Sequence, residues 1–316
     1  MIRFGIIGPG GISRRFARVM ATTECAKLVA IASSSPERAA AFAAQFDSPR
    51  IHQSYTALVN DPYVDAVYIG LTHNFHADVI RLCLEAGKPV LCEKPMVLHE
   101  ADAQALADLS RERGVLLMEA MWTRCQPAFR RARQWIAEGA IGQPKLVQAA
   151  FCFQAAYDPQ ARLFNPALAG GALYDAGVYP IEFATGILGE NPVETKGVLN
   201  IGPSGVDEYD AISLRFPSGA VAALSCGITA RASSDATVWG TQGHVVVYDF
   251  LRTQKVERYD AAGALAEAFE HKVDDGFVHE IEHFCELLRE GKTESPLIPL
   301  ADTIACAAVF DALLGK

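Results

Sequence analysis

The chain has 316 residues, 50% of them hydrophobic and 21% charged, which is ordinary globular composition and more sequence than one core usually holds. The formal net charge of -9 excludes a protein that binds nucleic acid through a basic face. No apolar run approaches the ~18 residues that predict a transmembrane helix.

The first 120 residues alternate between short apolar strands and helices. We expect strands at 2–7, 27–32, 66–70, 89–92 and 115–118, and helices ending at Met20 and spanning 36–46, 76–86 and 100–113. Strands that alternate with helices need crossover connections and form a parallel sheet. The sequence therefore predicts an α/β fold whose N-terminal domain, residues 1–120, is a Rossmann domain with a doubly wound parallel sheet.

The pattern changes after residue 120. A helix is predicted at 127–139, followed by β-rich runs at 145–153, 193–201, 209–216, 220–230, 236–240 and 244–249, and by helices at 277–290 and 300–313. Because no regular helix separates these runs, they indicate a mainly antiparallel sheet. We assign residues 121–316 to a C-terminal α+β domain for substrate binding and dimerisation, and expect the last helix to pack back on the Rossmann domain.

A glycine-rich turn lies between the first strand and the first helix. The residues are Gly8-Pro9-Gly10-Gly11-Ile12-Ser13, in which Ser13 replaces the third glycine of the usual dinucleotide-binding pattern. Gly8 allows the tight turn and Gly10 a close approach of the pyrophosphate, which the helix N-terminus then faces. The predicted cofactor contacts in this turn are Gly8, Gly10, Gly11 and Ile12.

The end of the second strand distinguishes NADP from NAD. No acidic residue stands there to bind the ribose hydroxyls, whereas Ser33 and Ser34 do, and Arg38 follows on the next helix. Hydroxyls and a guanidinium suit a 2′-phosphate, so we predict NADP rather than NAD. The alternative is a serine-rich helix cap with a solvated arginine, and Glu37 could still turn toward a ribose.

Polar residues also follow the third and fourth strands. Thr72, Asn74 and His76 lie after residues 66–70, and Glu93 and Lys94 lie after residues 89–92. Ligands bind at the carboxyl ends of parallel strands, so we place all five at the cofactor site. Thr72 and Asn74 could instead cap a helix. A buried Lys94 could donate to a substrate oxygen, although a lysine at a strand end is more often a surface residue.

One motif suggests a metal site. His279-Glu280-Ile281-Glu282-His283 matches H-E-x-x-H, the pattern of zinc proteases, but no third ligand follows at the required spacing. Phe277, Ile281, Phe284 and Leu288 instead form an apolar stripe at helical spacing. We therefore predict no metal site, and a zinc hydrolase is the weakest alternative function.

The eight cysteines are dispersed and include no C-x-x-C pair. Several lie in apolar runs, which is typical of free thiols buried in a reducing compartment. The N-terminus also lacks the pattern of a signal peptide. We therefore expect a cytoplasmic protein.

Several motifs occur together in a recognisable order. After the glycine-rich turn and the loop at 72–76 come Glu93-Lys94-Pro95, then residues 118–124 (MEAMWTR) and 170–180 (GGALYDAGVYP). In this order the chain resembles the glucose–fructose oxidoreductase / inositol dehydrogenase (Gfo/Idh/MocA) family. It is most similar to the branch that holds dimeric trans-dihydrodiol dehydrogenase and NADP-dependent D-xylose 1-dehydrogenase. The resemblance spans almost the entire chain.

The resemblance implies a set of catalytic residues. Lys94 of the E-K-P triplet would be catalytic, and Asp175 and Tyr179 would join it. Many members carry a His where this chain has Tyr179, so the Tyr indicates the dihydrodiol branch, in which it acts as general acid/base. Oxidation of an alcohol needs a base for the hydroxyl proton, and a nearby cation lowers the pKa of a phenol. Asp175 would bind a substrate hydroxyl or orient Tyr179.

Further cofactor contacts and an assembly follow from the same resemblance. Glu93 would lie near the nicotinamide, and Trp122 and Arg124 would contact the cofactor. A homodimer would form through the C-terminal sheet. On one face of that sheet we expect apolar residues including Val198, Leu199, Ile212, Leu214, Val221 and Leu224.

These observations favour an NADP-dependent oxidoreductase that transfers a hydride between the cofactor and a secondary alcohol or sugar carbon. The expected substrate is a small polyhydroxylated ring, such as D-xylose or a trans-dihydrodiol, and neither nucleic acid nor membrane is an expected partner. Two alternatives stay open: a keto-sugar reductase of the same family, and a non-catalytic dinucleotide-binding redox sensor.

Overall fold

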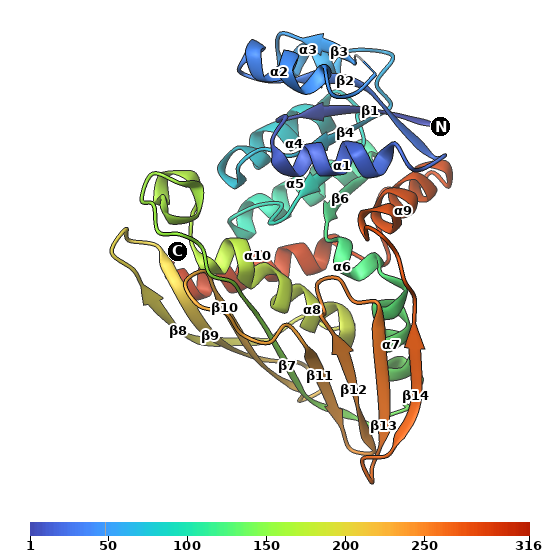
Figure 1. Cartoon of the computed structure of the whole chain (residues 1–316), viewed down its shortest axis with the longest axis vertical. Helices are drawn as coiled ribbons and strands as arrows, with labels where there is room; N and C mark the ends of the chain where they lie inside the picture. The colour runs from blue at the N-terminus through green and yellow to red at the C-terminus, as the bar shows by residue number, and fades with distance from the viewer. Residues whose placement is uncertain (48) are drawn as a thin grey trace. The chain divides into compact units, whose positions relative to one another are not determined.

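The computed structural model describes residues 1–47 and 49–316, which form two compact units. The first unit comprises residues 1–97, 101–120 and 277–300, and the second comprises 98–100, 121–276 and 301–316. Each unit contains one sheet with its own covering helices (Figure 1). Within the described part of the chain, we find no helix with the length and apolar character needed to cross a bilayer.

The sheet of the first unit is parallel and doubly wound. Its strands are β1 (Ile2–Ile7), β2 (Ala26–Ala32), β3 (Arg50–His52), β4 (Ala66–Ile69), β5 (Val90–Glu93) and β6 (Leu117–Ala120). They lie in the order β3-β2-β1-β4-β5-β6, and all the pairs are parallel. This order confirms the Rossmann sheet. The chain reverses direction across the sheet between β1 and β4, where such folds bind their ligands.

The helices of the first unit begin and end at the residues that the sequence marks. They are α1 (Gly11–Met20), α2 (Pro36–Ala43), α3 (Tyr55–Val59), η1 (His73–Phe75), α4 (His76–Glu85), α5 (Glu100–Arg113) and α9 (Phe277–Arg289). Ser35 caps α2 with Pro36 in its first turn, and Gly87 and Gly114 follow α4 and α5 with positive φ. The helix from the C-terminal region that clusters with this unit is α9. The last helix clusters with the second unit, unlike our expectation.

The second unit is built on an eight-stranded sheet. Its strands are β7 (Pro144–Cys152), β8 (Glu194–Ile201), β9 (Asp207–Arg215), β10 (Val221–Gly227), β11 (Ala236–Gly240), β12 (Gly243–Tyr248), β13 (Lys255–Asp260) and β14 (Leu265–Glu270). The order is β14-β13-β12-β11-β7-β10-β9-β8, with β7 and β10 parallel and the other pairs antiparallel. This confirms the mainly antiparallel sheet, while β13 and β14 extend it beyond the predicted strands.

Helices cover one face of this sheet. They are α6 (Trp122–Cys125), α7 (Pro127–Ala137), α8 (Val178–Leu188) and α10 (Leu300–Leu314), with short turns η2 (Arg162–Phe164) and η3 (Pro166–Leu168) and a π-helical turn, η4 (Leu173–Gly177). Helix α8 packs against strands β7 and β10. The turn η4 continues directly into α8, so residues 173–188 form one nearly continuous helix.

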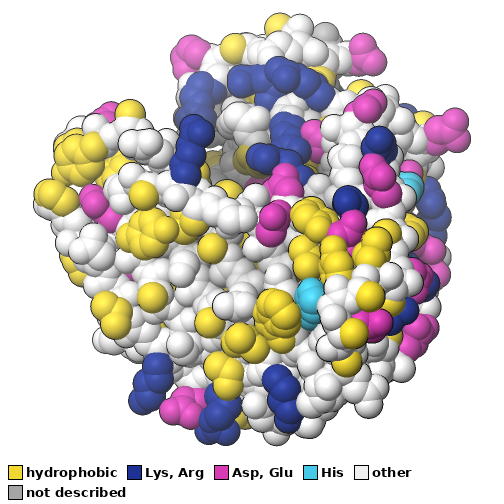
Figure 2. Space-filling model, turned by 60° about the horizontal axis from the view of Figure 1, so that its bottom comes forward, with side chains coloured by type: hydrophobic (Ala, Val, Ile, Leu, Met, Phe, Trp, Pro, Cys, Tyr) yellow, Lys and Arg dark blue, Asp and Glu magenta, His cyan; other side chains and the backbone are white. Residues whose placement is uncertain are grey.

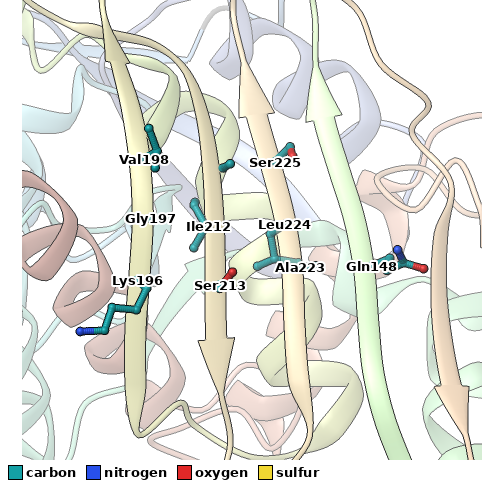
Figure 3. Close-up of a pocket in the computed structure, with 10 residues that line it drawn as sticks. Gln148, Lys196, Gly197, Val198, Ile212, Ser213, Ala223, Leu224 and Ser225 are labelled. Atoms are coloured by element: carbon teal, nitrogen blue, oxygen red, sulfur yellow. The ribbon is translucent and has the colours of Figure 1, made fainter.

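The opposite face of the sheet is open. Val198 on β8 is 75% exposed and Trp239 on β11 is 41% exposed, and the Trp239, His244 and Tyr259 rings stack in a row across three strands. Figure 2 shows hydrophobic side chains over this part of the surface, with charged side chains mainly toward its edges. Figure 3 shows Lys196, Val198, Ser213 and Ala223 side by side in a shallow depression on it.

The apolar residues that we expected on one face are divided between the two. Ile212, Leu214 and Leu224 are buried beneath the helices, whereas Val198 and Val221 lie on the open face. Strand alternation separates neighbours in this way, and the sequence alone does not give its phase.

Candidate active site

The turn between β1 and α1 depends on small residues. Gly8 has φ +87°, and a Cβ there would lie 2.7 Å from Leu71 Cδ2. The hydroxyl of Ser13 donates to the Gly8 carbonyl oxygen at 2.6 Å, and a Cβ on Gly70 would lie 2.1 Å from that hydroxyl oxygen. Ser13 therefore fills the third-glycine position by packing against another glycine, Gly70.

The N-terminus of α1 fits a dinucleotide pyrophosphate. Gly10 caps α1 without a side-chain hydrogen bond, and the first turn holds no acidic residue. A Cβ on Gly11 would meet no atom within 4 Å. The free N–H groups of this turn are thus open to an anion, as the cofactor prediction requires.

At the end of β2, one serine of the serine-rich segment caps a helix, and the segment leaves another serine exposed. Ser35 is the helix cap, because its hydroxyl oxygen accepts from the Arg38 backbone N–H at 3.2 Å. The same hydroxyl donates to Glu37 at 2.7 Å, and this bond lowers the pKa of the Glu37 carboxyl. Ser33 is buried and accepts from the Ser35 N–H, whereas Ser34 and the Arg38 side chain are exposed.

The loop after β4 is folded on itself. The Thr72 hydroxyl donates to the Asn74 side-chain oxygen at 2.8 Å, and residues 73–75 form η1. His73 is buried, whereas Asn74 is exposed. Thr72 and Asn74 therefore form a local turn at the carboxyl end of β4.

Two buried side chains anchor the loop that follows β5. The Nδ1 atom of His76 lies 3.0 Å from the Pro95 carbonyl oxygen, and Nε2 lies 3.1 Å from that of Leu71. The Glu119 carboxylate accepts from the Met96 backbone N–H at 2.8 Å. Both ring nitrogens face protein carbonyl oxygens, and burial lowers the pKa of the imidazole, so His76 holds this loop in place.

Glu93 and Lys94 stand at the end of β5. Glu93 is buried, and its carboxylate accepts from the Tyr68 hydroxyl at 2.5 Å. Burial raises the pKa of Glu93, while the Tyr68 bond and the nearby Lys94 charge oppose that effect. Tyr68 is itself stacked on Phe16 with ring centroids 3.7 Å apart. Lys94 is half-buried and follows Glu93, whose carboxylate is held in its orientation by Tyr68.

In the second unit, Asp175 and Tyr179 lie four residues apart where η4 runs into α8. This spacing places them on a similar side of the helix. The Asp175 carboxylate accepts from Arg162 Nη2 at 2.8 Å. The ring of Tyr179, which is half-buried, meets that of Phe151 edge-on at 5.3 Å. Asp175, Arg162 and Tyr179 therefore form a polar group beside an aromatic wall.

Two glycines bring Arg162 to this group. The N–H groups of Gly170 and Gly171 donate to the carbonyl oxygens of Asn165 and Leu163. A Cβ on Gly170 would lie 2.6 Å from the Arg162 carbonyl oxygen, so only glycine allows the loop to lie against the helix start. Our predicted catalytic and cofactor-binding residues did not include Arg162.

Arg124 has a structural role. It is 1% exposed and donates through Nε to the Glu182 carbonyl oxygen at 2.9 Å, through Nη2 to Thr185 Oγ1 and through Nη1 to Asp302 Oδ2, both at 2.5 Å. These contacts join α6 to α8 and α10. The guanidinium is thus engaged inside the second unit, whereas the resemblance implied a cofactor contact for Arg124. Trp122 is also buried, on the same short helix.

The H-E-x-x-H motif lies on α9. Glu280 is fully buried, and the His283 Nε2 atom lies 2.7 Å from Ser295 Oγ. Phe284 packs against Phe4 of β1, with ring centroids 5.6 Å apart. Over residues 1–47 and 49–316 there is no group of three or more His, Cys, Asp or Glu side chains that could hold a metal ion. Packing on the first unit accounts for the helix.

Comparison with known proteins identifies both units. Residues 2–121 match the family described as "Oxidoreductase family, NAD-binding Rossmann fold", and residues 129–246 match the "GFO/IDH/MocA C-terminal domain". Two similar curated proteins are trans-1,2-dihydrobenzene-1,2-diol dehydrogenases. The one from Sus scrofa is 34% identical and the one from Mus musculus 32% identical, each over 98% of this chain and 95% of the relative.

Solved structures show the same architecture. A 3-ketoreductase from Actinomadura kijaniata, in complex with NADP and TDP-benzene, is 29% identical with a TM-score of 0.86, and the match covers 99% of this chain and 97% of the other. An aldose-aldose oxidoreductase from Caulobacter crescentus, complexed with glycerol, is 26% identical with a TM-score of 0.88, covering 99% and 96%.

Proposed function

The chain belongs to the GFO/IDH/MocA oxidoreductase family, and on that premise we propose that it is an NADP-dependent dehydrogenase of a small polyhydroxylated ring. The substrate is an aldopyranose such as D-xylose or a cyclic trans-diol, oxidised at one secondary alcohol or sugar carbon. The observation that carries this proposal is the polar group of Asp175, Arg162 and Tyr179. A phenol and a carboxylate on one side of the helix can each bind one of two neighbouring substrate hydroxyls. The names of the curated relatives agree with it.

The cofactor assignment rests on the first unit. Gly8, Gly10 and the open first turn of α1 fit the pyrophosphate, and the exposed Ser34 and Arg38 suit a 2′-phosphate. The cofactor supplies the hydride acceptor for oxidation and the hydride donor for reduction. The 3-ketoreductase of Actinomadura kijaniata was solved with NADP, which also favours this choice.

Residues of the chain itself transfer the proton of the substrate hydroxyl. Tyr179 takes the hydroxyl proton as general base during oxidation and returns it as general acid during reduction. A phenol with a pKa near ~10 needs a neighbouring cation to serve as a base at neutral pH, and we assign Lys94 to that role. Asp175, oriented by Arg162, accepts a substrate hydroxyl. The same residues serve a keto-sugar reductase, so the two directions share one site.

We further propose that the open face of the second unit's sheet pairs with a second copy of the chain. Val198, Val221 and Trp239 are large apolar side chains on that face and remain exposed in a single chain. An exposed apolar sheet face of this kind marks an interaction surface.

The test is a screen at 340 nm with NADP and NAD against D-xylose, D-glucose, myo-inositol and a cyclic trans-diol. We expect turnover with NADP, and a loss of about 10²–10⁴-fold in kcat for Tyr179→Phe, which removes the general base. Tyr63→Phe, at an exposed tyrosine of the first unit, is the matched control and should keep full activity. Full activity in Tyr179→Phe would refute the mechanism. Tight cofactor binding without turnover of sugars, keto-sugars or diols would favour a redox sensor.

A further inference from the structure

Two carboxyl groups are buried on β9 behind the helix that carries Asp175 and Tyr179. Asp207 is 3% exposed and Asp210 is 1% exposed. They lie three residues apart, a spacing that normally turns side chains to opposite faces of a strand. The pairing of β8 with β9 is irregular here, with Ile201 opposite Asp207 and Asn200 opposite Tyr209. This bulge turns both carboxyl groups toward the covered face.

Asp207 contacts the start of the helix formed by η4 and α8, which carries Asp175 and Tyr179. Its Oδ2 atom accepts from the Leu173 backbone N–H at 2.5 Å. Gly171 has φ +121°, and a Cβ there would lie 2.2 Å from Asp207 Oδ1. The carboxyl group therefore lies directly against the backbone at residues 171–173, where η4 begins, and fixes the first turn of the helix that carries Asp175 and Tyr179.

Asp210 contacts the same helix indirectly, through Cys226 on β10. The Cys226 thiol donates to Asp210 Oδ2 at 3.3 Å. A Cβ on Gly177 would lie 3.0 Å from Cys226 Sγ, so the sulfur touches the backbone of η4 where it meets α8. Asp207 thus contacts the helix where η4 begins, and Cys226 contacts it where η4 ends.

Both carboxyl groups are buried on one face of the bulged strand, so a single proton on the pair avoids two like charges side by side. Burial, and then the neighbouring Asp207, raise the pKa of Asp210 to about 8. The other titratable groups that face the pair include Cys226 on β10 and Cys152 on β7. Tyr174 also faces it, and the Tyr174 hydroxyl accepts from Lys316 at 3.1 Å.

We propose that Asp207 and Asp210 are positioning residues. While the pair shares one proton, it holds in place the start of the helix that carries Asp175 and Tyr179. When that proton is lost, the pair releases the helix start. Loss of the proton leaves two negative charges in a buried site, and their repulsion weakens the contact with Leu173 and Gly171. In its effect on turnover this inference rests on the proposed function. Its structural part does not.

Hydrogen exchange tests the structural part without a substrate. Protection of the peptide at 171–179 is measured from about pH 6 to about pH 10 and corrected for intrinsic exchange. We expect wild-type protection to fall about tenfold above pH 8, as deprotonation of one group would produce. Asp210→Asn stays neutral and keeps a donor for Asp207, so it should hold its protection throughout. Asp260→Asn, at the exposed end of β13, should follow the wild type. Constant wild-type protection, or a fall in Asp210→Asn equal to that of the wild type, overturns the proposal.

The pH profile of kcat tests the link to turnover. We expect an alkaline fall in wild-type kcat that moves at least about one pH unit upward in Asp210→Asn, while the KM for NADP stays constant. A simple structural role would not move the profile. If exchange behaves as expected but no sugar or diol is turned over, the proposed function fails and the positioning pair stands. If turnover occurs and the profile of Asp210→Asn matches the wild type, the link from the pair to catalysis fails.

Discussion

In the proposed function, single exposed side chains at the end of β2 select NADP over NAD. The acid that would bind ribose hydroxyls is missing, and the nearby Glu37 is bonded to the helix cap Ser35. Its lowered pKa keeps it ionised, so a 2′-phosphate and Glu37 would repel each other unless Glu37 stays turned away. The Ser35 bond keeps it there. Ser34 and Arg38 are left as the groups that face solvent.

Removing the guanidinium therefore gives a prediction at the residue scale. Arg38→Ala should raise the KM for NADP by about 10–100-fold, since a hydrogen bond to a charged group contributes about 1.5–3 kcal/mol. The KM for NAD, which lacks the 2′-phosphate, should change little. Steady-state kinetics with both cofactors is the measurement, and Arg18→Ala, at an exposed arginine of α1, is the matched control. An equal loss for NADP and NAD would contradict the assignment.

Some site residues could be predicted from the sequence, because their position in the fold follows from local pattern. Gly8 and Lys94 each follow a recognisable strand, and a parallel sheet places them at one edge. Arg162 and Arg124 could not be placed in this way. Their partners, such as Asp175, Glu182 and Asp302, are 13 to 178 residues distant in the chain. The resemblance implied a cofactor contact for Arg124, but burial and four hydrogen bonds give it another role.

At the scale of elements, one side chain connects three helices of the second unit. Arg124 on α6 is bonded to α8 through Glu182 and Thr185, and to α10 through Asp302. A Cβ on Gly186 would lie 2.6 Å from Arg124 Nε, so α8 needs a glycine where the guanidinium passes. Tyr179 stands in the first turn of the helix that this network holds.

Arg124→Met tests the network. The variant retains apolar volume but leaves the carboxylates of Glu182 and Asp302 with less compensating charge in a buried site. We expect the free energy of unfolding to fall by about 3–5 kcal/mol, the usual cost of breaking a buried ion pair. Urea denaturation measures it, and Arg130→Met, an exposed position on α7, should change it by less than about 0.5 kcal/mol. A small loss in Arg124→Met would show that the network contributes little to stability.

The elements themselves were predictable where apolar periodicity was strong. Most strands and helices of the first unit lie close to the predicted ranges, but β3 and α3 were not predicted, and β6 begins at Leu117 rather than at Val115. The strand includes Glu119, which the apolar pattern excluded and which is buried because it accepts from Met96. β13 and β14 escaped prediction because charged residues interrupt them, and β14, at the edge of the sheet, has no buried residue.

At the scale of the whole molecule, the proposed homodimer through the open sheet face is the last prediction. Val198 stands on the open face of β8, the strand at one edge of the sheet, and is 75% exposed, so in the proposed dimer a carboxylate there would be buried without a partner. The wild type should sediment at twice the chain mass of 34.1 kDa. Val198→Glu should raise the dissociation constant at least about 100-fold, because an unpaired buried charge costs several kcal/mol. Ile51→Glu, at an exposed apolar residue of the first unit, should remain dimeric. A monomeric wild type, or a Val198→Glu variant as dimeric as Ile51→Glu, would place the interface elsewhere.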